Sequence, residues 1–217
     1  MPVPKHARPS AHRAMRSMNR SDNGRIVVVG DMQGNRTQPS SLEDGSFRLC
    51  EPGLTLSAAS THDGDVRQRI LALKYHNDRG QAVYLARLLA PLLHDLHPSP
   101  QVITWAPTTS RRIRERGLDQ AEWLARALAR ELGLPCKRLL KRINRDSQEG
   151  QNRITRLTRP RFRARVRPNM RCVVVVDDVI TTGATLRAAA KGLHAEGVVH
   201  VHAVAVSHRR RGRGAHR

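Results

Sequence analysis

One stretch constrains the fold of this chain more than any other, residues 173–185, which read VVVVDDVITTGAT. Its first four residues are β-branched, and such a run between polar residues is typical of a strand buried on both faces of a parallel sheet. Asp177 and Asp178 follow the run directly, and apolar residues then recur at helical spacing. The stretch therefore predicts a buried strand over 172–176, an acidic pair, a small polar loop and a helix over 184–196.

The acidic pair and the loop have the chemistry of a site for a phosphorylated sugar. Ligands of parallel α/β sheets bind beyond the carboxyl ends of the strands, where Asp177 and Asp178 fall. Two adjacent ionised carboxylates repel each other, and ribose hydroxyls or a Mg²⁺ ion would offset that repulsion. A glycine lets a ligand approach the backbone, and the N–H groups of a helix terminus favour a phosphate. The loop residues expected to cradle the phosphate are Thr181, Thr182, Gly183, Ala184 and Thr185.

The plain alternative is an ordinary strand–turn–helix with a threonine cap and two solvated aspartates, but turn chemistry does not require a double acid after a buried strand. The stretch resembles the motif of type I phosphoribosyltransferases: a hydrophobic run, two acidic residues and T-T-G-x-T. The resemblance implies that the loop holds the 5-phosphate of phosphoribosyl pyrophosphate (PRPP). It implies a catalytic role for Asp177 and Asp178, which would hold the ribose hydroxyls and contact Mg²⁺, directly or through ribose or water.

A wider resemblance, over about residues 62–207, is to the ComF subfamily of phosphoribosyltransferase-like proteins. The family pattern P-x(4)-R-x(3)-R-G-[FY]-N-Q is matched at five positions: Pro107, Arg112, Arg116, Gly117 and Gln120. Leu118 and Asp119 replace the aromatic residue and the asparagine of the pattern. Many family members open with a four-cysteine zinc module, whereas this chain has no CxxC, so its first 60 residues take no function from the resemblance.

The resemblance also implies where pyrophosphate binds. The expected site is a basic loop after a strand over 102–106, and its residues are Thr108, Thr109, Ser110, Arg112 and Arg116. The alternative for this loop is a run of solvated charges. Lys74 is a weaker candidate for a phosphate contact, and an ordinary surface lysine at a helix end is the alternative. Gln148, Arg153 and Arg156 are expected to lie in a flexible lid that closes over the substrate.

Strands separated by helices predict an α/β fold of the type I phosphoribosyltransferase kind, with a central parallel sheet flanked by helices and a flexible lid or hood. The expected divisions are a disordered basic arm (1–24), an irregular N-terminal segment without a zinc module (25–61), a phosphoribosyltransferase-like domain (62–207) and a basic tail (208–217). Further expected elements are a short strand at 25–30, a strand or hairpin within 47–60, helices starting near 66 and over 81–93 and 118–132, and a strand over 199–207.

Composition bears mainly on partners and location. The formal net charge is +21, which suits nucleic acid as well as a polyphosphate substrate. Residues 137–171 alone carry thirteen Lys and Arg against two acidic residues, a net charge of +11. Three single, widely spaced cysteines are expected to be reduced thiols. With no long apolar run and no apolar segment behind the basic N-terminus, we expect a cytoplasmic protein with no membrane contact.

Two functions follow from these patterns. The first is a PRPP- and Mg²⁺-dependent phosphoribosyltransferase of the ComF type with an unknown acceptor, and the resemblance adds a link to competence and DNA uptake. The second is a nucleic-acid-binding accessory or regulatory protein that uses the PRPP site as a sensor. Aromatic residues are only 3% of the chain, so binding to nucleic acid is expected to be weak and electrostatic. Whether the chain forms a homodimer is left open.

Overall fold

The computed structural model describes residues 40–41, 45–76, 78–94, 96–117, 119–143 and 160–209. The strands are β1 (Ser40–Ser41), β2 (Phe47–Glu51), β3 (Leu54–Thr61), β4 (Val102–Trp105), β5 (Leu140–Arg142), β6 (Phe162–Ala164), β7 (Cys172–Ile180) and β8 (His200–His208). The helices are α1 (Gly64–Tyr75), α2 (Arg79–Leu89), the 3₁₀ turn η1 (Ala90–Leu93), α3 (Ser110–Arg116), α4 (Gln120–Leu132) and α5 (Ala184–His194).

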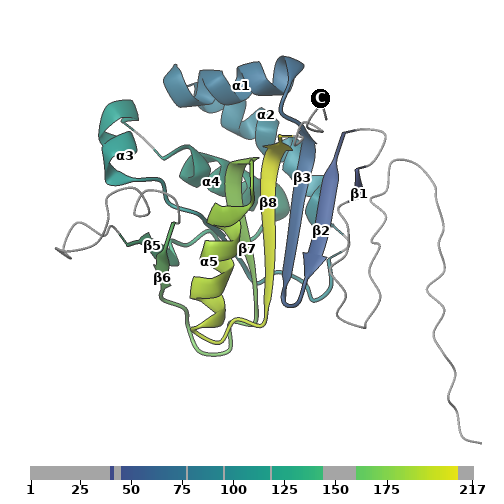
Figure 1. Cartoon of the computed structure of the whole chain (residues 1–217), viewed down its shortest axis with the longest axis vertical. Coiled ribbons are helices and arrows are strands. Elements are labelled where there is room, and N and C mark those ends of the chain that lie inside the picture. The colour runs from purple at the N-terminus through teal and green to yellow at the C-terminus, as the bar shows by residue number, and fades with distance from the viewer. Residues whose placement is uncertain are drawn as a thin grey trace, which may run out of the picture.

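The described strands form a main sheet with the order β1-β2-β3-β8-β7-β4 (Figure 1). The four strands β3, β8, β7 and β4 run parallel, and β1 and β2 extend the sheet by antiparallel pairing. A separate antiparallel hairpin, β5–β6, lies beside α5. The predicted fold class is confirmed, since the structure is a mixed α/β domain whose central, mostly parallel sheet is flanked by helices.

The predicted buried strand is β7, which lies between β8 and β4. Residues 173–176 are fully buried, as the β-branched run indicates. The strand is longer than predicted, because β8 stays paired with it as far as Ile180, opposite His208. The β4 ladder ends earlier, at Val176. Asp177 and Asp178 therefore lie within the last part of β7, beside a gap in strand pairing, rather than after the strand.

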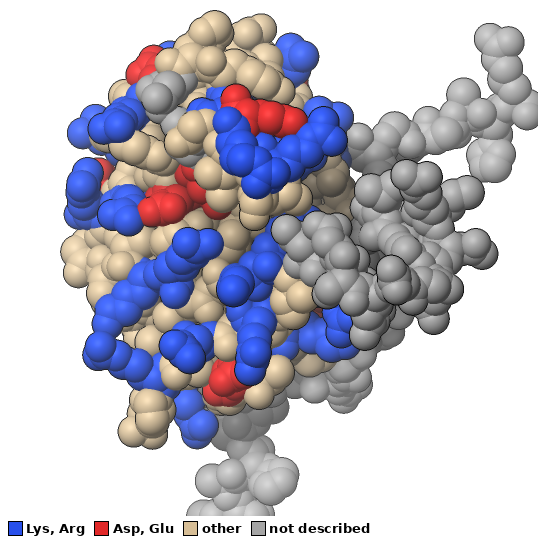
Figure 2. All heavy atoms as spheres, turned by 90° about the vertical axis from the view of Figure 1, so that its left-hand side faces the viewer, with Lys and Arg blue, Asp and Glu red and all other residues tan. Residues whose placement is uncertain are grey.

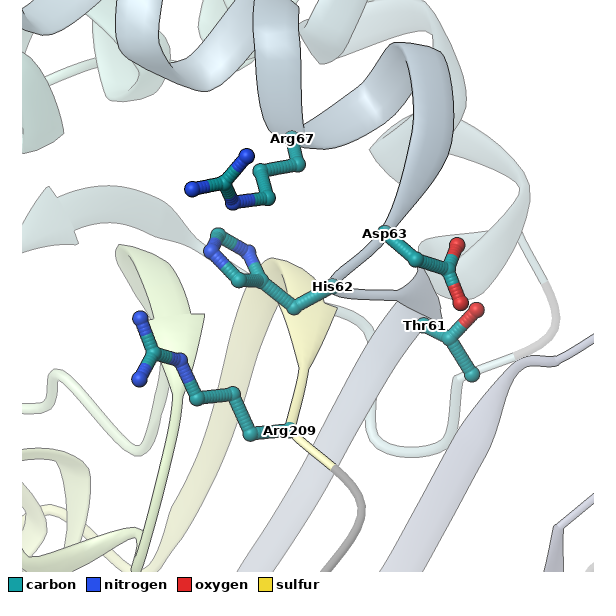
Figure 3. A pocket seen from close by; sticks show the side chains of 5 residues that line it. All are labelled: Thr61, His62, Asp63, Arg67 and Arg209. Atoms are coloured by element: carbon teal, nitrogen blue, oxygen red, sulfur yellow. The ribbon is translucent and has the colours of Figure 1, made fainter.

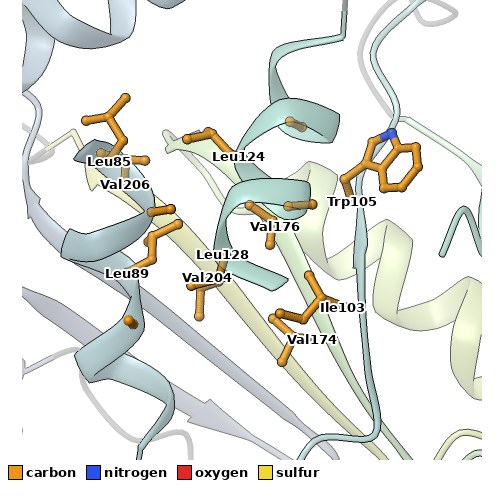
Figure 4. Close-up of a cluster of buried hydrophobic side chains, with 14 of the residues drawn as sticks. Leu85, Leu89, Ile103, Trp105, Leu124, Leu128, Val174, Val176, Val204 and Val206 are labelled. Carbon is orange, nitrogen blue, oxygen red and sulfur yellow. The ribbon is translucent and has the colours of Figure 1, made fainter. Parts of the chain in front are cut away.

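Two layers of apolar side chains cover the sheet. Helices α2 and α4 pack on one face, where Val174 and Val176 of β7 meet Leu124 and Leu128 of α4 (Figure 4). Helix α5 and the β5–β6 hairpin pack on the other face, against Val173 and its neighbours. Because side chains alternate along a strand, β7 supplies both layers, which explains why its run is apolar without interruption.

Helix α4 shows how local sequence sets an element. Its buried residues recur at i, i+3 and i+4, as in a helix with one apolar face. Asp119 caps the start by accepting a hydrogen bond from the Ala121 N–H at 3.2 Å. Gly133 ends the helix in the left-handed conformation, with φ of 65°. The predicted bounds, 118–132, differ from the observed ones only at the N-terminal end.

Two predicted elements differ from the structure. The basic loop predicted after β4 contains the short helix α3, whose N-cap is Thr109 and which ends at Gly117 with φ of 74°. Only one of its residues, Ile113, is apolar, so hydrophobic periodicity could not indicate it. The helix predicted over 81–93 is α2 followed by the tighter turn η1, because Pro91 lacks the N–H that an α-helix would need there.

The expected division at residue 62 falls inside the sheet. The segment expected to be irregular contains the β2–β3 hairpin, which agrees with the strand or hairpin predicted within 47–60. Strand β3 pairs in parallel with β8, so the sheet begins before the expected boundary. At the other end, His208 belongs to β8 rather than to a tail. The arm over 1–24 and the strand predicted at 25–30 lie outside the described residues.

Two further expectations concern cysteines and membranes. Cys136 and Cys172 are free thiols, and burial raises the pKa of both, to about 11 for Cys172. These two thiols are therefore unreactive near neutral pH. Among the helices that the structure describes, none combines the length and the apolar character needed to span a bilayer.

Candidate active site

The acidic pair divides between the two faces of the sheet. Because successive residues of a strand point to opposite faces, Asp177 lies on the α5 face and Asp178 on the face of α1, α2 and α4. Lys74, near the end of α1, forms an ion pair with Asp178, and both side chains are mostly shielded from solvent. Lys74 is thus beside the acidic pair, as expected for a site residue, although its partner here is a carboxylate.

Asp177 has an unfavourable environment for a charge. Burial raises the pKa of its carboxyl group, and the nearby charge of Asp178 raises it further. Two contacts oppose the rise: the Asp178 N–H donates to Asp177 Oδ1 at 2.9 Å, and Lys74 contributes a positive charge. A strongly raised pKa is typical of a functional carboxylate. Ribose hydroxyls or a cation would provide the stabilisation that the protein itself does not.

The loop after β7 ends at a helix terminus that receives little capping. Gly183 is the N-cap of α5 in the left-handed conformation, with φ of 73°, and it has no side chain to cap the helix. The Ala184 N–H makes a long hydrogen bond, 3.3 Å, to Thr182 Oγ1. The next N–H groups have no partner within the helix by geometry. Thr181, Thr182 and Ala184 are exposed at this terminus, where the helix dipole favours an anion.

Arg187 holds the loop from the side of α5. Its Nη1 donates to the Thr182 carbonyl oxygen at 2.8 Å, and its Nη2 donates to Glu51 Oε1 at 2.6 Å. A Cβ atom at Gly183 would lie 2.5 Å from Arg187 Nη1, so another residue there would displace this guanidinium in addition to being strained at the positive φ. Arg187 and Glu51, positioning residues, were missed by sequence reasoning because they are 136 residues apart.

The loop after β4 is held in a different way. The Thr108 N–H donates to Asp119 Oδ2 at 3.1 Å, and Thr109 Oγ1 accepts a hydrogen bond from the Arg112 N–H at 3.3 Å. Asp119 is buried, and that burial raises the pKa of its carboxyl group despite the hydrogen bonds from Thr108 and Ala121. Side chains of the protein thus already accept hydrogen bonds from two backbone N–H groups of this loop. Ser110 is the first residue of α3.

Three arginines surround this second loop. Arg142, on β5, donates to the Pro107 carbonyl oxygen at 3.4 Å, and its guanidinium lies 5.5 Å from the centre of the Phe162 ring. Burial lowers the pKa of Arg142, the charge of Arg112 lowers it further, and Asp177 opposes the decrease. Arg142 therefore lies near both the loop and the acidic pair. Sequence reasoning did not single it out among the thirteen basic residues of its segment.

Arg116 has a different environment from Arg112. Its Nη1 donates to Gln120 Oε1 at 3.3 Å, and its guanidinium lies 5.3 Å from the Tyr75 ring centre. Gln120 is 3% exposed, and its Nε2 has no hydrogen-bond partner among the described residues. A buried amide without a partner is costly unless a ligand or water satisfies it. Gln120, a matched position of the ComF pattern, is therefore a further candidate beside the second loop.

The structure brings most of the predicted residues to one edge of the sheet. The acidic pair, the loop of residues 181–185 and Lys74 belong to β7, α5 and α1, and the second loop with Arg112 follows the neighbouring strand β4. The predicted lid residues, Gln148, Arg153 and Arg156, lie outside the described residues. The described part of the chain contains no group of three or more His, Cys, Asp or Glu side chains that could hold a metal ion.

Comparisons with known proteins agree with the fold. Residues 118–217 match the family described as phosphoribosyl transferase domain, a region that includes the acidic pair and the loop after it. A search of curated proteins found no match. The match agrees with the expected type I phosphoribosyltransferase fold.

Solved structures that match this chain include adenine phosphoribosyltransferase from Leishmania donovani, with 16% identity and a TM-score of 0.42. The match covers 73% of this chain and 72% of that chain. Adenine phosphoribosyltransferase from Trypanosoma brucei, in complex with AMP, pyrophosphate and ribose-5-phosphate, has 13% identity, coverage of 72% and 84%, and a TM-score of 0.40. Hypoxanthine phosphoribosyltransferase from Trypanosoma cruzi has 18% identity, coverage of 68% of each chain and a TM-score of 0.36. Because their TM-scores are below 0.5, these matches carry no argument about fold or substrate.

Proposed function

We propose that this protein binds PRPP across the carboxyl edge of its sheet and transfers the phosphoribosyl group to an acceptor, with release of pyrophosphate. One observation carries the proposal: a poorly capped helix terminus with a left-handed glycine directly follows a half-buried acidic pair at the end of a central parallel strand. The family match over residues 118–217 supports it. The five matched positions around α3 support the narrower ComF type.

Each part of PRPP has a set of groups suited to it. The 5-phosphate would bind the N–H groups at the start of α5 and the hydroxyls of Thr181, Thr182 and Thr185. The ribose hydroxyls would donate to Asp177 and Asp178. At Asp178, a ribose hydroxyl would replace part of the ion pair with Lys74. The ammonium group of Lys74 could then contact a phosphate oxygen.

The pyrophosphate would lie over the second loop. Arg112 and Arg142 are close enough for one charge to lower the pKa of the other, so an anion between them would relieve the repulsion. The hydroxyls of Thr108, Thr109 and Ser110 add donors, and Arg116 with Gln120 borders the same loop. Charge-assisted contacts of this kind are the strong ones for a polyphosphate.

The residues present fit Mg²⁺ only as a partner of the substrate. Two carboxylates are available at Asp177 and Asp178, and Mg²⁺ is commonly held by one or two carboxylates together with substrate phosphates. When bound, the ion would reduce the negative charge on the pyrophosphate oxygens. The protein contributes the orientation of the ribose and the cations around the leaving group.

The chemistry follows from the charges that develop. As the C1–O bond breaks, its electron pair leaves with pyrophosphate and the ribose ring gains positive character. Asp177 and Asp178 can stabilise that positive character through the ribose hydroxyls, and Arg112 and Arg142 can stabilise the negative charge on pyrophosphate. Asp177, Asp178 and Arg142 already have partners within the protein before reaction, which lowers the reorganisation needed.

Isothermal titration with PRPP, with and without Mg²⁺, tests the proposal. We expect binding to require the divalent ion, followed by pyrophosphate release in a screen of bases and amines. A folded protein that shows no PRPP binding with Mg²⁺ present would contradict the proposal. PRPP binding without pyrophosphate release from any acceptor would favour the sensor function instead.

The second candidate, a nucleic-acid-binding regulator, is favoured by the surface charge. Figure 2 shows Lys and Arg side chains over much of the face that carries α3 and the β5–β6 hairpin. Fluorescence anisotropy with single-stranded DNA, at about 150 mM salt where the Debye length is near 8 Å, separates the two functions. We expect weak binding that weakens steeply with salt. Sub-micromolar binding that PRPP alters, in a chain lacking residues 1–23 and 210–217, would favour the regulator.

A further inference from the structure

A pocket lies beside the proposed PRPP site, where β3 and β8 end and α1 begins. It has a volume of about 450 Å³ and is lined by Thr61, His62, Asp63, Arg67 and Arg209 (Figure 3). This volume is within the range of pockets that bind small molecules. None of these residues belongs to the acidic pair or to the two loops described above.

The side chains of this pocket concentrate positive charge. Arg67, from α1, and Arg209, after β8, both extend toward His62, while the carboxylate of Asp63 points away from the two guanidinium groups (Figure 3). Neither arginine forms an ion pair with a carboxylate of the described chain. Two guanidinium groups without an acidic partner make a site suited to an anion.

His62 adds a fixed, neutral hydrogen-bonding group. Its Nδ1 lies 2.8 Å from Ser207 Oγ, which sets the orientation of the ring. Burial lowers its pKa, and the charges of Arg209, Lys74 and Arg67 lower it further, against a smaller opposite effect of Asp178. The imidazole is therefore neutral near pH 7 and leaves the binding of an anion to the two arginines.

The pocket adjoins the proposed ribose site on the side away from the second loop. The Arg209 N–H donates to the Ile180 carbonyl oxygen at 2.9 Å, so Arg209 lies next to the start of the 5-phosphate loop. In the strand order β3-β8-β7-β4, the pocket follows β3 and β8, the acidic pair is on β7, and the second loop follows β4. The pocket and the proposed pyrophosphate site thus lie on opposite sides of the acidic pair.

We infer that this pocket binds the acceptor and that the acceptor is an acid, a small ring carrying both a nucleophilic nitrogen and a carboxylate. The inference rests on the proposed function, since a nucleophile must reach C1 from the side opposite the leaving pyrophosphate. The nitrogen lone pair forms the C1–N bond, the C1–O bond breaks with its electron pair on pyrophosphate, and the nitrogen proton passes to solvent. Arg67 and Arg209 hold the carboxylate and so select acids over neutral rings.

Matched pairs of probes that differ by one carboxylate test the inference. The pairs are 2-aminobenzoate with aniline, and 6-carboxyuracil with uracil, each titrated into the full chain with ribose 5-phosphate present. We expect the acid of at least one pair to bind ten or more times tighter than its neutral partner. Arg67→Ala and Arg209→Ala should each reduce that preference about fivefold or more. Arg130→Ala, which removes an exposed arginine on α4, should leave the preference unchanged.

The outcomes separate this inference from the proposed function. Equal affinity for acid and neutral probes, or no binding of either, overturns the acidic acceptor, while PRPP binding in the same protein preserves the PRPP site. Arg67→Ala could also weaken ribose 5-phosphate as much as it weakens the acid. That result would make the pocket part of the phosphate site and would overturn the inference. Preference for single-stranded DNA over every acid would assign the pocket to a nucleic-acid backbone instead.

Discussion

Two loops follow neighbouring strands at the same edge of the sheet, and they offer different groups to an anion. The loop after β7 leaves backbone N–H groups of α5 available, and Gly183 caps nothing. The loop after β4 has its Thr108 N–H bound to Asp119 and its helix capped by Thr109. Anion binding at the second loop is therefore expected to come mainly from side chains, above all from arginines. Two neighbouring strands thus end in sites of different chemistry, one built on backbone dipoles and the other on side-chain cations.

The difference has a physical consequence. Backbone N–H groups and a helix dipole are fixed by the fold, so the first loop should depend on steric fit and little on any one side chain. Each guanidinium group is a separate charge, and Arg112 is exposed to solvent ions, so the second loop should depend on single arginines and on salt.

The largest effect is expected for Gly183→Val. A branched side chain at φ of 73° is strained, and its Cβ would lie 2.5 Å from Arg187 Nη1. Ribose 5-phosphate should bind at least 100-fold more weakly by titration calorimetry, about 2.7 kcal/mol. Gly197→Val is the matched control, since that glycine also has a positive φ, 89°, but has open space around it. Equal ribose 5-phosphate affinity in the two variants would mean that the phosphate binds elsewhere.

The next effect tests the acidic pair between the loops. Asp177→Asn combined with Asp178→Asn should weaken PRPP and ribose 5-phosphate at least tenfold, about 1.4 kcal/mol, because each amide offers one neutral acceptor oxygen to the ribose hydroxyls in place of two charged ones. Inorganic pyrophosphate, titrated without Mg²⁺, has no sugar hydroxyls for the pair to hold, so its affinity should not fall. Circular dichroism checks the fold, and unchanged PRPP affinity in a folded double variant would remove the pair from the site.

Arg142→Ala tests the cation side of the comparison. Inorganic pyrophosphate should bind about tenfold more weakly, in line with a charge-assisted contact of about 1.5–3 kcal/mol, and the deficit should shrink as salt is raised. Ribose 5-phosphate should be unaffected. Arg163→Ala, an exposed arginine on the adjacent strand β6, is the matched control. If the two variants bind pyrophosphate equally well, Arg142 is not part of the second site.

A separate effect concerns the stability of the protein without ligand rather than its affinity for one. The pKa of Asp177 is raised in the native state from its ordinary 3.8, so the native protein binds this proton more strongly than the unfolded chain does. The free energy of unfolding should therefore fall as pH rises from about 4 through the raised pKa, by about 1.36 kcal/mol for each pH unit between the two pKa values. An asparagine at this position does not titrate, so Asp177→Asn should be more stable than the wild type in urea at neutral pH.

The same comparison at low pH provides the check. Below the ordinary pKa of aspartate, both states of the wild type are protonated at this residue, and the advantage of Asp177→Asn should vanish. Asp65→Asn, on the exposed surface of α1, should show no such pH-dependent gain. A variant that is less stable than the wild type at every pH would mean that the charged Asp177 carboxylate is already well compensated in the native protein.

Local pattern explains how much of this site the sequence could predict. The strand, the acidic pair and the start of α5 follow one another in the chain, and each has its own residue preference, so residues 173–185 predicted all three. The fold class followed from strands alternating with helices. Helix α3 was missed because caps at Thr109 and Gly117, rather than apolar spacing, define it.

The parts that could not be predicted join distant segments. Glu51 and Arg187 meet across 136 residues, and neither has a local pattern that marks the contact. Arg142 lies beside Pro107 because the β5–β6 hairpin packs on the α5 face, which single-sequence patterns do not reveal. The pocket of His62, Arg67 and Arg209 likewise depends on β3 lying next to β8.

The pairing of β3 with β8 has a consequence for how the protein is made. Residues 54–61 of β3 pair with residues 201–208 of β8, so an inner strand of the sheet has its parallel partner close to the end of the described residues. Contacts of such sequence separation are slow to form. During synthesis, β3 should remain without its parallel neighbour until β8 has left the ribosome. The anion-binding edge should therefore assemble only after residues 201–208 have been translated, and a nascent chain should present an open strand edge to chaperones until then.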